Sequence, residues 1–207
     1  MSDSRFLYLA SQSPRRRQLL EQIGVTYTLL LPNAEGDIAE DAEAIEAVLP
    51  GELPQAYVQR VTGLKLDAAV ARHARRQLAP APILCSDTTV ALGSEILGKP
   101  EEAADATRML QMLAGQTHTV LTAVAIHHGE ERWAELSVSH VTFAPMTAAE
   151  IAAYVASGEP MGKAGAYGIQ GRAASYVERM EGSYSGIMGL PVFETSQLLK
   201  RMGWTIG

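Results

Sequence analysis

Two different arrangements of strands are encoded in this chain, and together they limit the possible folds. Apolar runs at residues 6–10 and 25–31 predict two strands, and a helical pattern from Pro14 to Gly24 lies between them. Residues 119–126 and 133–143 flank the turn His128-Gly129-Glu130 and predict a long antiparallel hairpin. A helical crossover connects parallel strands and a tight turn connects antiparallel ones, so the sequence predicts an α/β fold with a mixed sheet.

The remaining pattern predicts further elements in the same class. A strand at 83–92 turns at Gly93-Ser94 and returns through 95–97. The final strands are expected to form a hairpin between 175–180 and 185–188. The acidic stretch from Pro32 to Pro54 is expected to be a solvated loop with a short helix. Helices are expected at 55–77, from Pro100 to near Gly115, at 147–158 with a capping box, and at 191–202. No linker divides the chain, so we expect a single domain over residues 1–207.

Composition excludes several classes of protein. Of the 207 residues 47% are hydrophobic and 19% are charged, which excludes a disordered chain. The formal net charge of −6 argues against a nucleic-acid partner, and the lack of a long apolar stretch argues against a membrane partner. The single cysteine, Cys85, excludes an internal disulfide. The first residues show no signal-peptide pattern, so the expected location is the cytoplasm.

Three arginines occupy the first turns of the helix that follows Pro14. Arg15, Arg16 and Arg17 stand where the helix dipole is already positive, so they are unfavourable there unless an anion is present. A phosphate chain at the helix N-terminus would suit them. The alternative is a basic helix end that pairs with neighbouring carboxylates.

Asp87 conflicts with its surroundings because it lies in an otherwise apolar strand. It could hold Mg²⁺ or act as a general base on water, or it could simply be hydrogen-bonded to backbone at an irregularity. Lys99 follows the 95–97 strand, and a lone lysine in a turn is ordinarily only solvated. The glycine-rich loop from Lys163 to Arg172 contains Gln170, whose amide could read a base edge, although a surface loop explains it as well.

Several motifs occur in the order found in the Maf family of nucleoside triphosphate pyrophosphatases, which this chain resembles from about residue 6 to residue 202. They are residues 7–20 (LYLASQSPRRRQLL), Ser86-Asp87-Thr88, Gly98-Lys99-Pro100, 113–118 (LAGQTH), 163–171 and 188–191 (MGLP). The resemblance implies an elongated mixed β-sheet with flanking helices, in which two lobes enclose a cleft, as in inosine triphosphatase-like proteins.

The resemblance also implies an activity and a set of site residues. The family hydrolyses nucleoside triphosphates to the monophosphate and pyrophosphate, with a divalent metal cation, Mg²⁺ or Mn²⁺. Asp87 would accept the proton of the attacking water and bind the metal, together with Glu35. The residues implied to bind substrate are Ser11, Arg15, Arg16, Lys65, Thr88, Lys99 and Gln170.

Three of these positions resemble the branch of the family that acts on dTTP and UTP: Arg15, Thr88 and Gln170. The alternatives are the branch acting on 7-methyl-GTP and a nucleotide-binding regulator of cell division that does not hydrolyse. Modified pyrimidine nucleotides and a homodimer stay open. The family's acidic pair is incomplete, because Gly36 follows Glu35, and the acidic segment 37–54 has no functional counterpart.

Overall fold

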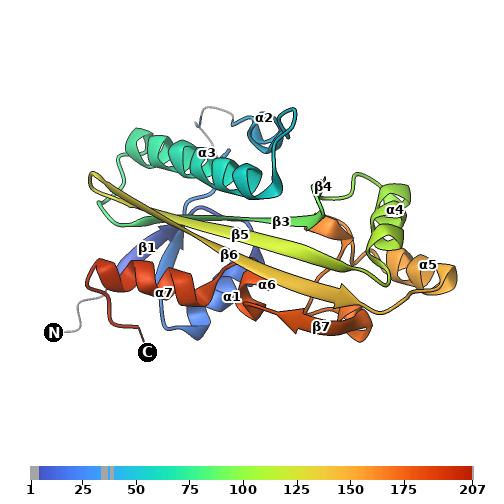
Figure 1. Cartoon of the computed structure of the whole chain (residues 1–207). Coiled ribbons are helices and arrows are strands. Elements are labelled where there is room, and N and C mark those ends of the chain that lie inside the picture. Colours follow the sequence, from blue (N-terminus) through green and yellow to red (C-terminus); the bar gives the residue numbers. More distant parts are fainter. Residues whose placement is uncertain (1–4, 34–36, 38–39, 207) are drawn as a thin grey trace.

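The computed structural model describes residues 5–33, 37 and 40–206, and these residues form one mixed sheet flanked by helices (Figure 1). The seven strands are β1 (Phe6–Leu9), β2 (Thr26–Leu29), β3 (Ile83–Leu92), β4 (Glu95–Leu97), β5 (Thr117–His128), β6 (Glu131–Phe143) and β7 (Val177–Glu181). The helices are α1 (Pro14–Gln22), α2 (Ala42–Glu46), α3 (Pro54–Arg75), α4 (Ala103–Leu113), α5 (Ala148–Ala156), α6 (Tyr184–Met188) and α7 (Val192–Arg201). Two short 3-10 segments, η1 (Ala164–Ala166) and η2 (Arg172–Tyr176), lie in the glycine-rich region.

The sheet combines the two kinds of pairing that the sequence predicts. Its strand order is β2-β1-β3-β5-β6-β7, with β4 also paired to β3. Strand β1 is parallel to both β2 and β3, whereas β3, β5, β6 and β7 are antiparallel to one another in turn. In the hairpin His128 pairs with Glu131, so the turn is only Gly129-Glu130, and Gly129 adopts a positive φ of 64°. The expected elongated mixed sheet is confirmed.

Helices cover both faces of the sheet. Helix α3 lies on one face, while α1, α6 and α7 lie on the other, and α4 and α5 sit at the end away from β1 (Figure 1). The larger core, which includes Leu9, Leu20 and Leu198, fills the α1/α7 face. A smaller cluster fills the α3 face and includes Leu66, Ile83 and Cys85.

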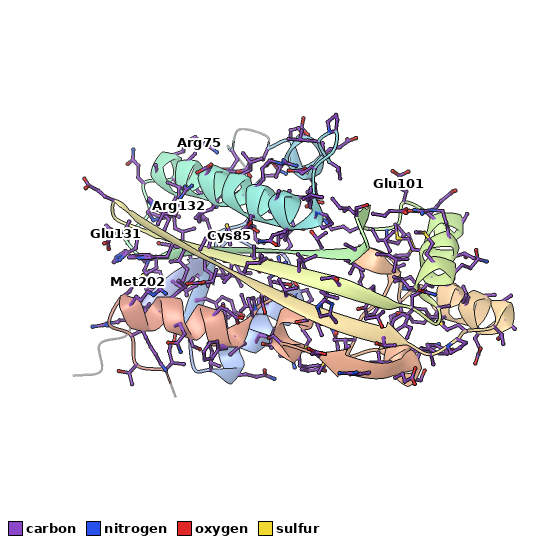
Figure 2. All side chains as sticks on the ribbon, in the orientation of Figure 1. Arg75, Cys85, Glu101, Glu131, Arg132 and Met202 are labelled. Atoms are coloured by element: carbon purple, nitrogen blue, oxygen red, sulfur yellow. The ribbon has the colours of Figure 1, made fainter. Side chains whose placement is uncertain are left out.

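Figure 2 places Cys85 in the interior between α3 and the sheet, consistent with complete burial of its side chain. Burial raises the pKa of this thiol to about 12.

Arg132, at the turn end of β6, reaches Asp67 of α3 at 2.5 Å (Figure 2). No helix in the described part of the chain combines the length and apolarity that crossing a bilayer requires.

One predicted element is wrong, and another starts later than predicted. The residues expected as the second strand of the last hairpin form helix α6 instead, because the Ser183 hydroxyl accepts a hydrogen bond from the backbone N–H of Gly186 and caps a helical turn. The helix expected from Pro100 begins only at Ala103, since Glu102 keeps an extended backbone (φ −146°, ψ 175°). The first-turn acidic residue is therefore Asp105.

His118 lies in an aromatic cluster of the larger core with Phe143 and Tyr167, and the residue is 1% exposed. Its Nε2 lies 2.8 Å from the Tyr167 hydroxyl. Burial lowers the pKa of His118 to about 4, so the folded protein holds a neutral ring where the unfolded chain takes up a proton.

We therefore expect the stabilisation from neutral His118 to be complete above pH 6.5, the ordinary value, and to be lost as the pH falls toward 4. The loss should be about 3 kcal/mol of unfolding free energy. Urea denaturation of wild type and His118→Phe at several pH values measures it. The control is His140→Gln, a change at an exposed histidine, which should keep the wild-type dependence of unfolding free energy on pH. An unchanged pH dependence in His118→Phe would contradict the assignment.

Candidate active site

A gap in the strand pairing at one edge of β3 creates the site. Strand β5 pairs with β3 along one edge from 83 to 91. On the other edge, β1 pairs only with 83–84 and β4 only with 90–92. The segment between these pairings has a strand neighbour on one side only, in the part of the chain that the structure describes. A polar stretch of β3, which contains Asp87, is therefore open toward the carboxyl end of β1, the usual position of ligand sites in α/β sheets.

A cavity of about 550 Å³ opens at this edge. Its walls come from segments that are far apart in the sequence: the β1–α1 turn, α2, α3, β3 and the loops around 162–169 and 187–189. The predicted residues that line it are Ser11, Arg15, Arg16, Lys65, Asp87, Thr88 and Lys99. The volume is within the range of pockets that hold a small molecule.

Neighbouring residues of β3 serve opposite faces of the sheet, because side chains alternate along a strand. Asp87 belongs to the set that faces α3, and its Oδ1 accepts a hydrogen bond from Lys65 Nζ at 2.6 Å. Ser86 and Thr88 face α1 and α6. The Ser86 hydroxyl donates to the Gly189 carbonyl at 3.0 Å, and Thr88 accepts from Thr122 at 3.0 Å. The exposed edge thus presents a carboxylate on one side and hydroxyls on the other.

Lys65 joins two carboxylates. Its Nζ lies 2.6 Å from Asp87 Oδ1 and 2.6 Å from Glu46 Oε1. Burial disfavours the charged form of Lys65, but the two carboxylates outweigh burial and raise its pKa. Burial likewise opposes the charge of Glu46, and Lys65 and Lys99 outweigh it and lower the pKa of this carboxyl. Lys65 and Glu46 are therefore charged together at neutral pH.

Arg15 and Arg16 point from α1 toward the loop after α6. Arg15 Nε donates to the Met188 carbonyl at 3.1 Å, and Arg16 Nε donates to the Gly189 carbonyl at 2.6 Å. The other guanidinium nitrogens of Arg16 donate to Ser11 Oγ at 3.1 Å and to Thr88 Oγ1 at 3.4 Å. Burial lowers the pKa of both arginines. Backbone carbonyls and hydroxyls, rather than carboxylates, hold these guanidinium groups, so the groups keep positive charge available for a ligand anion.

The helix that the sequence predicts from Pro14 is α1. Pro14 is the first helical residue and Gly24 has the positive φ of 68° expected after the helix. Ser13 is the N-cap by position, but its side chain makes no capping bond, and its own backbone N–H donates to Ser11 Oγ. Arg17 does not line the cavity.

The glycine-rich region forms the far wall. Lys163, Tyr167 and Ile169 line the cavity there. Gly165 lies at φ 66°, and a Cβ atom at this position would meet Val90 Cγ1 at 2.7 Å. Gln170 is exposed and is not among the lining residues, so the structure does not bring it together with the other predicted residues.

Two carboxylates from the acidic segment line the cavity, and sequence reasoning missed both. Glu46 bonds to Lys65 and Lys99, and Glu40 forms a two-pronged pair with Arg72 at 2.8 and 2.5 Å. No sequence motif distinguishes either glutamate from its acidic neighbours. The only signal in the sequence was the high content of acidic residues in this segment. Glu35, the predicted second metal ligand, lies outside the described residues.

The donor set suits a hard divalent cation that arrives with a phosphate ligand. Among described residues no group of three or more histidine, cysteine, aspartate or glutamate side chains is arranged to hold a metal. Mg²⁺ commonly binds through one or two carboxylates plus substrate phosphates, and Asp87 lines the cavity with one oxygen bonded to Lys65. The cavity therefore fits such a cation through Asp87.

The protein thus combines a mixed sheet with a cavity lined by several cationic side chains, which suits a small polyanion as the ligand. The family model "Maf-like protein" matches residues 6–202. The chain is 66% identical over 201 residues to a dTTP/UTP pyrophosphatase of a Polaromonas species, an overlap that covers 97% of this chain and 98% of the relative. It is 65% identical to the dTTP/UTP pyrophosphatase of Cupriavidus metallidurans, covering 95% of this chain and 96% of the relative. The chain belongs to the Maf family.

Gly165 should be indispensable to the far wall. In Gly165→Ala the new methyl group would clash with Val90 and would also strain the backbone, so we expect a loss of several kcal/mol of unfolding free energy, more than the roughly 1–2 kcal/mol that a left-handed backbone costs alone. Gly129→Ala is the matched control, because Gly129 has φ 64° and open space around its Cβ position. Urea denaturation should separate the two variants; equal losses would exclude the clash.

Proposed function

We propose that this protein hydrolyses dTTP and UTP to the nucleoside monophosphate and pyrophosphate. The observation that carries the proposal is the convergence of seven predicted residues, from α1, α3, β3 and two loops, on one cavity. Relatives named dTTP/UTP pyrophosphatase, at 62–66% identity over almost the whole chain, support the choice of substrates.

In the proposed reaction, water attacks the α-phosphorus. The new bond forms between the water oxygen and phosphorus, and the bond from phosphorus to the α–β bridging oxygen breaks, so pyrophosphate leaves. Asp87 accepts the proton of the attacking water. Lys65 Nζ, at 2.6 Å from Asp87 Oδ1, donates a hydrogen bond that fixes the direction of this carboxylate.

The cations bind and orient the triphosphate. Arg15 and Arg16 are held by backbone carbonyls at 3.1 and 2.6 Å, so their positions are set before the ligand arrives. Lys65 and Lys99 can donate hydrogen bonds to phosphate oxygens from the opposite side of the cavity, and Ser11 and Thr88 supply hydroxyls. Gln170 remains the predicted base reader, and its exposed position means that a base contact would require movement of the loop or the ligand.

A divalent cation, Mg²⁺ or Mn²⁺, is part of the proposal. Asp87 would hold it together with substrate phosphate oxygens, and Glu35 is the predicted second ligand. When bound, such a cation neutralises phosphate charge in the transition state. The proposed place of action is the cytoplasm, and the proposed unit is the single domain over residues 1–207.

Release of pyrophosphate from dTTP, UTP and 7-methyl-GTP, measured side by side with and without a chelator, tests the proposal. We expect turnover of dTTP and UTP that the chelator abolishes and that Mg²⁺ or Mn²⁺ restores. A preference for 7-methyl-GTP would assign the chain to the other branch. Binding without turnover of any triphosphate would favour the non-hydrolysing regulator.

Asp87→Asn should lower kcat by roughly 10²–10⁴-fold, because the amide cannot accept the proton of water. Nucleotide binding should persist, since the arginines and lysines that bind phosphate are unchanged. Pyrophosphate release gives kcat, and calorimetric titration with dTTP gives the affinity. Turnover near the wild-type rate would remove Asp87 from the role of base.

A further inference from the structure

Hydroxyl groups of the sheet hold α6 in place. Thr122 of β5 donates a hydrogen bond to the Gly186 carbonyl at 2.7 Å, and Ser139 of β6 accepts one from the Ser183 backbone N–H at 2.9 Å. The loop that accepts hydrogen bonds from the two arginines of α1 follows α6 directly in the chain. The position of this loop therefore depends on how the sheet holds α6.

Thr122 is buried beside the cavity but is not among the residues that line it. The residue is 1% exposed, and it lies opposite Thr88 in the register of β3 and β5. Its Oγ1 lies 2.7 Å from the Gly186 carbonyl oxygen and 3.0 Å from Thr88 Oγ1. Because a buried polar atom that loses its partner is costly, these two contacts fix the positions of Gly186 and Thr88 relative to β5.

Both contacts of Thr122 lead to Arg16. Along the first route, the Gly186 carbonyl also accepts the backbone N–H of Gly189 at 2.9 Å, and the Gly189 carbonyl accepts Arg16 Nε at 2.6 Å. Along the second route, Thr88 Oγ1 accepts from Arg16 Nη2 at 3.4 Å. Two nitrogens of the Arg16 guanidinium are therefore bonded to groups that Thr122 itself holds.

Gly189 makes the first route short. Its φ is 122°, and a Cβ atom at this position would lie 3.6 Å from both Arg16 Nε and Thr88 Oγ1. The N–H and the carbonyl of this one residue bond to Gly186 and to Arg16, respectively. A displacement of the Gly186 carbonyl is thus passed on to the acceptor of the arginine within a single residue.

We propose that Thr122 is a positioning residue for the triphosphate site, which sets the direction of the Arg16 guanidinium through Gly186 and Thr88 without touching the ligand. The inference rests on the proposed function. Arginine binds phosphate through a planar fork of N–H groups, so its affinity depends on the direction of the fork as well as on its charge. Loss of the Thr122 hydroxyl leaves the charge of Arg16 in place and releases its direction.

Thr122→Val tests the proposal because it removes the hydroxyl and keeps a side chain of similar shape. Release of pyrophosphate from dTTP in Mg²⁺ buffer gives the kinetic constants. We expect KM to rise about tenfold with kcat unchanged, because the interaction with the phosphates weakens equally in the bound substrate and in the transition state. Calorimetric titration with a dTTP analogue, in which a methylene group replaces the α–β bridging oxygen, should show the same loss of affinity.

Matched variants control for the change at this position. Thr122→Ser keeps the hydroxyl and should keep the wild-type KM. Thr122→Ala also removes the hydroxyl, so it should raise KM as the valine variant does, and it serves if the valine variant does not fold. Thr119→Val removes a hydroxyl from the opposite face of β5, where Thr119 Oγ1 lies 3.4 Å from His140 Nδ1, and should leave KM unchanged.

A double-mutant cycle tests the route through Arg16. Arg16→Gln should weaken binding of the dTTP analogue by itself. If Thr122 acts through Arg16, addition of Thr122→Val to Arg16→Gln should cause no further loss. Losses that add would show that Thr122 acts through another group and would overturn the assignment.

Other outcomes also overturn the inference. An unchanged KM in folded Thr122→Val refutes it. A lower apparent kcat with an unchanged KM would show only a smaller folded fraction, and hence a merely structural role. An equal rise of KM in Thr119→Val would indicate general weakening of the sheet. Absence of wild-type turnover refutes the proposed function, whereas titration with the analogue still tests Thr122, because that measurement requires binding alone.

Discussion

A carboxylate in the middle of a strand is the constraint on which the rest of the site depends. Asp87 has a side chain only 13% exposed, and such a group is stable there only if a cation reaches it. Helix α3 supplies that cation through Lys65, which requires the helix to pack along this face of β3. The strand in turn must lack a neighbour on one edge at this point, or no ligand could approach the pair. The short pairing with β1 and the late pairing with β4 meet that requirement.

Buried charges on the opposite face of the sheet are also stabilised, but without carboxylates. Burial disfavours the charges of Arg15 and Arg16, and both residues are held by neutral oxygen atoms instead. The site therefore contains two kinds of cation. Lys65 and Lys99 are already neutralised within the protein, while the two arginines retain charge that a ligand can neutralise. This division explains how a chain with a net charge of −6 can offer a site for a polyanion.

Local patterns in the sequence predicted most of the fold. The crossover around α1, the long hairpin and the capping box at Thr147 depend on neighbouring residues, and the structure contains each of them. Helix α6 was wrongly predicted as a strand because a serine cap and a glycine decide its conformation, whereas the strand assignment weighed only the apolar residues. The start of α4 was misplaced for a comparable reason, since proline is compatible with both a helix start and an extended turn. For the site, motif order identified the side chains that share the cavity. It could not identify Glu46, because ion pairs between separate elements leave no local pattern.

The closure of the cavity has a consequence for biosynthesis. The Arg15 and Arg16 side chains bond to carbonyls that lie 173 residues later in the chain. A nascent polypeptide emerging from the ribosome can form the α1 crossover early, but its two guanidinium groups have no acceptors until the α6 turn and Gly189 have been translated. The binding site is thus completed only after Gly189 has been translated, and a product truncated before Met188 would expose this basic surface to other cellular anions.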